Sequence, residues 1–103
     1  MSEPVRVGTL LAALPGMATR LAEARVVAAW AEIAGPAAAR TRAEGVDAGI
    51  LRVAVESSGW LHRLSLDEAA LLDRCRAIAP AANIRAIRFH LAPVGAVEGE
   101  VVR

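Results

Sequence analysis

The chain has 103 residues and a net charge of +1, because its eleven acidic residues nearly balance its twelve basic residues, all of which are arginine. This length allows one small domain, and the near-neutral charge gives no general sign of nucleic-acid binding. One cysteine excludes an internal disulfide, and without a membrane-spanning run or a secretion signal we expect a cytoplasmic protein with no membrane partner.

Two helices are predicted in the first third of the chain. The first is a short amphipathic helix that ends at Pro15-Gly16, and its apolar stripe consists of Val7, Leu10, Leu11 and Leu14. The second runs from about residue 19 to residue 34, before the stop signal Gly35-Pro36. Its buried face is expected to comprise Val26, Val27, Trp30, Ile33 and Ala34. Leu21 falls on the opposite side and is expected to pack separately, against the first helix.

A β-hairpin is predicted after an alanine-rich link. Residues 42–46 form a weak strand candidate interrupted by Gly45, and the turn at 47–49 leads into a second strand at 50–56. The side chains of the second strand alternate between its two faces. Those expected to face the core are Leu51, Val53 and Val55, and those expected on the open face are Arg52, Ala54 and Glu56.

A third helix is predicted from Ser58 to about Ala79, where Pro80 ends it. Ser57 or Ser58 can accept a hydrogen bond from a free amide of its first turn. Its apolar arc consists of Trp60, Leu61, Leu64, Leu71, Leu72, Cys75, Ile78 and Ala79.

One carboxylate, Glu68, falls inside this arc. Ser65 and Glu68 have the spacing of a capping box, so the helix either breaks there or continues with Glu68 at a partly wet edge. We expect a continuous helix, because residues 63–66 contain neither glycine nor proline.

The last predicted strand spans residues 85–91, and its core-facing residues are Ile87, Phe89 and Leu91. The order helix, helix, strand, strand, helix, strand describes an α+β fold in which helices cover one face of a small three-stranded sheet. We expect a single domain over residues 1–93 and a short flexible tail at 94–103.

An enzyme is the least favoured function, because no catalytic motif is visible. His62, His90 and Cys75 are too few and too poorly spaced for a zinc site. Cys75 is expected in the core and His62 in water. No glycine-rich phosphate loop leads from a strand into a helix. We therefore expect no catalytic residue, cofactor, metal or small-molecule substrate.

A basic patch on the open sheet face could contact a phosphate backbone. Its expected members are Arg40, Arg42, Arg52, Arg85, Arg88 and His90. This face has no aromatic residue on which bases could stack, so binding is expected to be weak, non-specific and salt-sensitive. The alternative is that these side chains only keep the face soluble beside Glu44 and Glu56.

The two tryptophans are predicted to differ in role. Trp30 is central on its helical face and is expected in the core. Trp60 lies in the first turn of its helix, at the edge of the apolar arc. It either closes the end of the core or, with Leu61 and Arg63, anchors a partner protein, since tryptophan is enriched at binding hot spots.

The order of these residues resembles the DciA-like family of bacterial proteins. The resemblance rests mainly on Trp30-x-x-Ile33-Ala34-Gly35-Pro36 and on Leu51-x-Val53-x-Val55-x-Ser57-Ser58-x-Trp60. It continues through Leu64, Leu71-Leu72 and Ile84-x-x-Ile87-x-Phe89. It therefore covers nearly the whole chain, and the combination of the two tryptophan blocks is its specific part.

This resemblance implies a fold similar to a type II KH domain and a non-enzymatic role in the initiation of DNA replication. Such proteins bind the replicative helicase and single-stranded DNA and assist helicase loading. By position, Trp60 would be the motif tryptophan that contacts the helicase, and the structural positions would be Trp30, Ile33, Gly35 and Phe89.

Two departures from the family pattern leave an alternative open. Many family members carry a basic, flexible extension that helps to grip DNA, and this chain has almost none. The Gly-x-x-Gly loop of nucleic-acid-binding KH domains is also missing from the sequence. The alternative is a stand-alone KH-like protein that binds RNA or single strands without a helicase partner.

Overall fold

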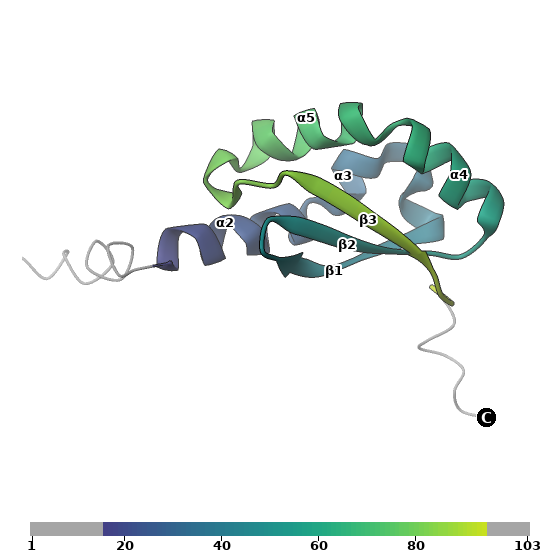
Figure 1. Cartoon of the computed structure of the whole chain (residues 1–103), viewed down its shortest axis with the longest axis horizontal. Helices are drawn as coiled ribbons and strands as arrows, with labels where there is room; N and C mark the ends of the chain where they lie inside the picture. The colour runs from purple at the N-terminus through teal and green to yellow at the C-terminus, as the bar shows by residue number, and fades with distance from the viewer. Residues whose placement is uncertain (1–15, 95–103) are drawn as a thin grey trace, which may run out of the picture.

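The structure, a computed structural model, describes residues 16–94. The helix predicted through Val7 and Leu14, and almost all of the tail predicted at 94–103, lie outside the described residues. The elements in chain order are α2 (Met17–Ala28), α3 (Trp30–Ala34), the 3-10 helix η1 (Gly35–Arg40), β1 (Thr41–Asp47), β2 (Ile50–Val55), α4 (Ser58–Leu66), α5 (Glu68–Ile78), the 3-10 helix η2 (Pro80–Ala82) and β3 (Ala86–Leu91) (Figure 1).

The three strands form one mixed sheet in the order β1-β2-β3. β1 and β2 are antiparallel, and β2 and β3 are parallel. Ala48 and Gly49 have φ values of 53° and 81°, and two successive positive values are typical of the tight turns that join hairpin strands. The predicted hairpin is confirmed, and a bulge between Ala43 and Gly45 accommodates the glycine that weakened the first strand in the sequence.

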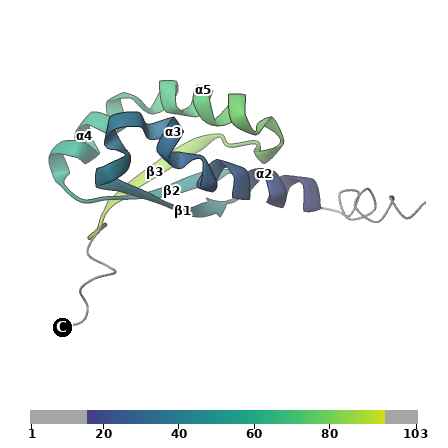
Figure 2. The same cartoon turned by 180° about the vertical axis from the view of Figure 1, so that it is seen from behind.

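The helices lie together on one side of the sheet, and the opposite face is open (Figures 1 and 2). α2 packs over β1, whereas α4 and α5 run along β3. This two-layer arrangement confirms the predicted α+β fold, and it is compatible with the type II KH topology. Within residues 16–94, no helix combines the length and the apolar character needed to cross a membrane.

The core between the two layers contains most of the predicted apolar residues. Its largest fully buried side chains are Ile33, Leu51, Ile84, Val26, Val53, Val55 and Cys75. Trp30 is buried, as predicted, and its indole N–H donates to the hydroxyl of Thr41 at 2.9 Å. Leu21 is 55% exposed, and the first helix, against which it is expected to pack, lies outside the described residues.

The prediction of a continuous helix over residues 58–79 is wrong. The chain turns at Asp67, where φ is −96° and ψ is 9°, and α5 begins at Glu68. The carboxylate of Glu68 accepts a hydrogen bond from the backbone N–H of Ile87 on β3 at 3.0 Å. The break therefore coincides with a tertiary hydrogen bond that satisfies a backbone amide of the edge strand. No glycine or proline marks the break in the sequence.

The helix predicted over residues 19–34 is also divided in the structure. Ala29, with φ −94° and ψ 7°, separates α2 from α3. Trp30 is the first residue of α3, and its bond to Thr41 ties the new helix to the start of β1. A tertiary hydrogen bond therefore accompanies this break too.

Two strand residues lie differently from their prediction. Ala54 was expected on the open face, yet it is 0% exposed. Its strand partners are Arg42 and His90, and longer side chains on both sides cover a methyl group on the central strand. Leu91 was expected to face the helices, yet it is 56% exposed, because it is the last residue of an edge strand.

Candidate functional site

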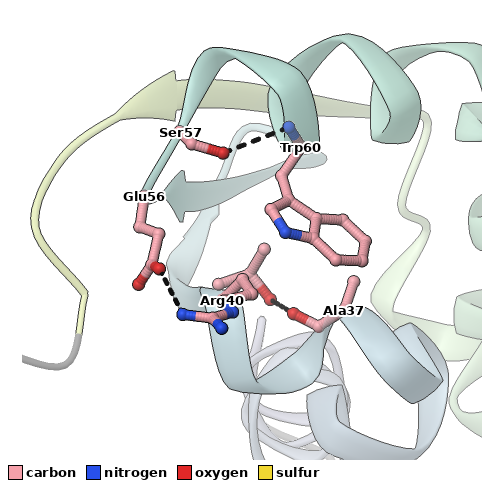
Figure 3. Close-up of polar contacts among 6 residues, drawn as sticks. Ala37, Arg40, Glu56, Ser57 and Trp60 are labelled. Atoms are coloured by element: carbon pink, nitrogen blue, oxygen red, sulfur yellow. Dashed lines mark hydrogen bonds and ion pairs between the residues drawn. The ribbon is translucent and has the colours of Figure 1, made fainter.

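Trp60 is positioned by the junction between β2 and α4. Ser57 follows the strand in an extended conformation and is the N-cap residue of α4. Its Oγ accepts a hydrogen bond from the backbone N–H of Trp60 at 3.3 Å (Figure 3). The predicted cap is therefore confirmed at the first of the two candidate serines. It places the indole in the first turn of α4, over η1 and beside Ala37 (Figure 3).

A groove of about 250 Å³ lies between the helices α4 and α5 on one side and the α3–η1 segment on the other. We call it the Trp60 groove, and its lining residues are Ala34, Pro36, Ala37, Trp60, Arg63, Leu64, Asp67, Ala70, Leu71 and Arg74. The lining combines small or aliphatic residues with three charged ones, of which two are arginines and one is an aspartate. Its shape comes from alanines opposite a tryptophan, since the small side chains leave space that the large ring borders.

The α3–η1 wall of the groove is fixed by buried hydrogen bonds. The hydroxyl of Thr41 accepts from Trp30 and donates to the carbonyl oxygen of Ala37 at 2.8 Å. Gly35, at the turn between α3 and η1, has φ 60° and ψ −127°, a conformation that glycine adopts far more easily than other residues. A structural role for Trp30 and Gly35 stays a prediction, and the burial of Trp30 and the backbone angles of Gly35 are its physical basis.

Arg74 of α5 joins the α3–η1 wall through a contact that no sequence pattern predicts. Its Nη1 donates to the carbonyl oxygen of Ile33 at 2.8 Å, an acceptor near the end of α3. The two residues are 41 positions apart, so only the folded chain brings them together. The contact uses one of the five N–H donors of the guanidinium group.

A second hollow, of about 340 Å³, lies at the start of α4 and is lined by Ser57, Gly59, Trp60 and Arg63. Trp60 and Arg63 border both hollows, and Trp60 is half-buried. Leu61, predicted with them, is half-buried against the core and borders neither hollow. The structure therefore brings together two of the three residues predicted for partner binding.

Carboxylates neutralise part of the predicted basic patch. His90 Nε2 donates to Glu44 at 2.7 Å across the central strand, and Arg42 lies 3.7 Å from the same carboxylate. The hydrogen bond from His90, with the positive charges of His90, Arg52 and Arg42, holds the pKa of Glu44 below the ordinary 4.5, against the opposing effect of desolvation.

The remaining arginines of the patch occupy different ends of the sheet. Arg40 donates to Glu56 at 2.7 Å at the Trp60 end of the sheet (Figure 3). Arg85 donates through Nε to the carbonyl oxygen of Ala48, in the hairpin turn at the other end. The six predicted residues therefore do not form one continuous patch.

Arg52 and Arg88 are left as the positive centre of the open face. They are partners in the β2–β3 register, and both are exposed. Together with Asp47 and Ile50 they line a shallow hollow of about 230 Å³. Within residues 16–94, no carboxylate lies within 4.0 Å of either guanidinium group.

The other singled-out residues have ordinary structural positions. Ile33 is buried, and Phe89 is half-buried against the core. His62 is exposed. Burial raises the pKa of the Cys75 thiol, opposed by the nearby charge of Arg76. Within the described part of the chain, no group of three or more potential metal ligands comes together.

Comparison with known proteins identifies the family. No match was found among the curated proteins. One family model, described as "Dna[CI] antecedent, DciA", matches residues 6–89. This family implies, in general terms, a non-enzymatic role in helicase loading during DNA replication. Because the match covers most of the chain and includes both tryptophans, the chain belongs to the DciA family.

Proposed function

We propose that this protein binds the replicative DNA helicase through the Trp60 groove and helps to place it on single-stranded DNA. The observation that carries the proposal is a half-buried Trp60 that borders two hollows together with Arg63. Its backbone is already held by the Ser57 cap, so little ordering is needed before a partner covers the exposed part, which favours binding. Tryptophan and arginine also dominate binding energy at many protein interfaces, and Arg63 lies one helical turn away.

The single-stranded DNA would contact the open sheet face at Arg52 and Arg88. Like charges directly opposite each other on neighbouring strands are unfavourable, and an anionic phosphate between them would relieve the repulsion. With only this pair and no aromatic stacking residue, the affinity for DNA is expected to be weak and independent of sequence.

The alternative function, a stand-alone RNA or single-strand binder, has less support. The only aromatic residues in the sequence are two tryptophans and one phenylalanine, and none of them lies on the open face. The junction between α4 and α5 carries Asp67 and Glu68, whose negative charges would repel a phosphate backbone. Strong binding of nucleic acid in the absence of helicase would favour this alternative over our proposal.

A titration of the cognate replicative helicase with the wild-type chain and with Trp60→Ala tests the proposal. Truncation of a hot-spot residue costs about 2 kcal/mol or more, so Trp60→Ala should weaken binding by roughly 25-fold or more. Leu72→Ala is the matched control, because Leu72 is also half-buried against the core but borders neither hollow. Circular dichroism of both variants confirms that they are folded.

Two results would contradict the proposal. One is the failure of the folded wild-type chain to form a complex with the helicase at micromolar concentrations. The other is an equal loss of affinity in Trp60→Ala and Leu72→Ala, which would mean that general destabilisation, rather than the tryptophan surface, controls binding.

A further inference from the structure

We infer that the Trp60 groove takes an acidic segment of its protein partner, which lays one bulky apolar side chain against the exposed part of Trp60. The inference rests on the proposed function and adds the chemistry of the segment that is recognised. It follows from the size, the lining and the charge of the groove.

The size of the groove suits a single side chain. Its volume is about 250 Å³, below the roughly 300–1,000 Å³ of sites that hold small molecules. Alanine methyl groups form one wall, and Leu64 and Leu71, both buried, contribute on the other side. The alanines of that wall and the two leucines are already buried, so an incoming aliphatic or aromatic side chain would cover Pro36, Ala70 and the exposed part of Trp60. It would gain free energy from the apolar area of these three residues that is removed from water.

The charge at the rim favours carboxylates beside the inserted side chain. Arg63 and Arg74 border the groove with a single acid, Asp67. Within residues 16–94, neither arginine has a carboxylate within 4.0 Å. Arg74 uses one N–H on the carbonyl oxygen of Ile33, and its remaining donors can bind an incoming carboxylate with charge-assisted hydrogen bonds.

The same features make nucleic acid a poorer occupant than a peptide. Recognition of a base requires hydrogen-bonding groups at its edge as well as a stacking surface. Apart from Trp60 and the three charged residues, the lining consists of alanine, proline and leucine side chains, which offer no hydrogen bond to a base edge, and Asp67 would repel a nearby phosphate. An acidic peptide with one apolar anchor satisfies both the apolar lining and the basic rim.

The test measures the affinity of the replicative helicase for four variants of the full chain. Ala70→Trp fills the groove from an exposed position on α5 and should weaken binding at least tenfold. Arg63→Glu reverses one rim charge and should weaken binding by about tenfold. Asp67→Asn removes the acid and should strengthen binding by about twofold to threefold, in line with a partly exposed charge interaction. The control is His62→Glu, which adds a negative charge at an exposed α4 residue outside the groove. It should leave the affinity unchanged.

The increase in affinity expected for Asp67→Asn cannot arise from misfolding. This variant therefore distinguishes an effect of groove charge from an effect of lost stability. The inference is overturned if Trp60→Ala weakens helicase binding but Ala70→Trp and the two charge variants do not, a result that leaves the proposed function intact. If the wild-type chain does not bind the helicase at all, the proposed function itself fails.

A parallel titration with a labelled oligo-dT tests whether nucleic acid, instead of a peptide, occupies the groove. Loss of oligo-dT binding in Ala70→Trp, with helicase binding retained, would assign the groove to nucleic acid.

Discussion

The two tryptophans differ in burial and in the atom through which each is hydrogen-bonded. Trp30 is buried, and its indole N–H has a partner in Thr41, as a buried polar group requires. Trp60 is held through its backbone N–H by Ser57, while its side chain remains half-buried and borders two hollows. The ring of Trp60 therefore keeps surface that a partner can cover, whereas that of Trp30 does not.

Gly35 sets the direction of the chain at the groove wall, so its substitution should destabilise the fold. An alanine at φ 60° and ψ −127° would be strained, although nothing lies within 4 Å of the added Cβ. Gly35→Ala is expected to lower the free energy of unfolding by about 1–3 kcal/mol in urea denaturation.

Gly59→Ala is the matched control for this prediction. Gly59 lies inside α4 without a positive φ, and nothing lies within 4 Å of its added Cβ. An alanine there should stabilise the helix by about 0.5–1 kcal/mol. If both alanine variants shift stability in the same direction, the backbone strain assigned to Gly35 is wrong.

At the scale of the sheet, the Glu44–His90 pair joins β1 to β3 across buried Ala54 and makes stability depend on pH. The pKa of Glu44 is lowered in the folded state, chiefly by the hydrogen bond from His90. The unfolded chain therefore takes up the proton first as pH falls. The stabilisation from Glu44 is fully present above the ordinary pKa of 4.5, and it is lost as the pH falls through the folded value.

Glu44→Gln is expected to remove this part of the pH dependence. Its free energy of unfolding should be lower than that of the wild type at neutral pH, and the two should converge in acid. Urea denaturation from neutral pH to below pH 4 measures the difference. His90→Ala removes the same hydrogen bond from the other strand and should flatten the curve in the same region. A constant gap between wild type and Glu44→Gln at every pH would contradict the assignment.

The Arg52–Arg88 pair on β2 and β3 gives a prediction for DNA. Two phosphate contacts on a single strand correspond to a slope of about −1.4 in a plot of log K against log salt. Arg52→Ala combined with Arg88→Ala should weaken binding to oligo-dT and bring the slope towards zero. Arg40→Ala is the control, because Arg40 is paired with Glu56 at the other end of the sheet. An unchanged slope in the double variant would exclude this face as the DNA contact.

Local patterns in the sequence predicted the hairpin, a serine cap at residue 57 or 58 and the core-facing residues of β2, because each depends on residues close together in the chain. The breaks at Ala29 and Asp67 were not predictable in this way. They accompany the bonds Trp30–Thr41 and Glu68–Ile87, which join residues distant in sequence. The alternation of β2 also could not reveal that Ala54 is covered, since its neighbours come from two other strands.

At the scale of the whole molecule, the two candidate surfaces lie on different sides. The helices lie on one side of the sheet and leave its other face open (Figures 1 and 2). The Trp60 groove is lined by residues of the helices, and Arg52 and Arg88 are exposed residues of the strands β2 and β3. A protein partner on the helices would leave the open face accessible to a DNA strand. The groove itself could not be deduced from the sequence, because it joins residues 34–37 to residues 60–74.

The central claim is that the helicase covers the Trp60 groove, and amide hydrogen exchange of the whole chain tests it most directly. Exchange is compared between the free chain and its complex with the replicative helicase. We predict slower exchange in the complex over residues 58–66 and 33–37, with little change over the strands at 41–47 and 50–55. Slower exchange confined to the strands, in a complex that demonstrably forms, would contradict the claim.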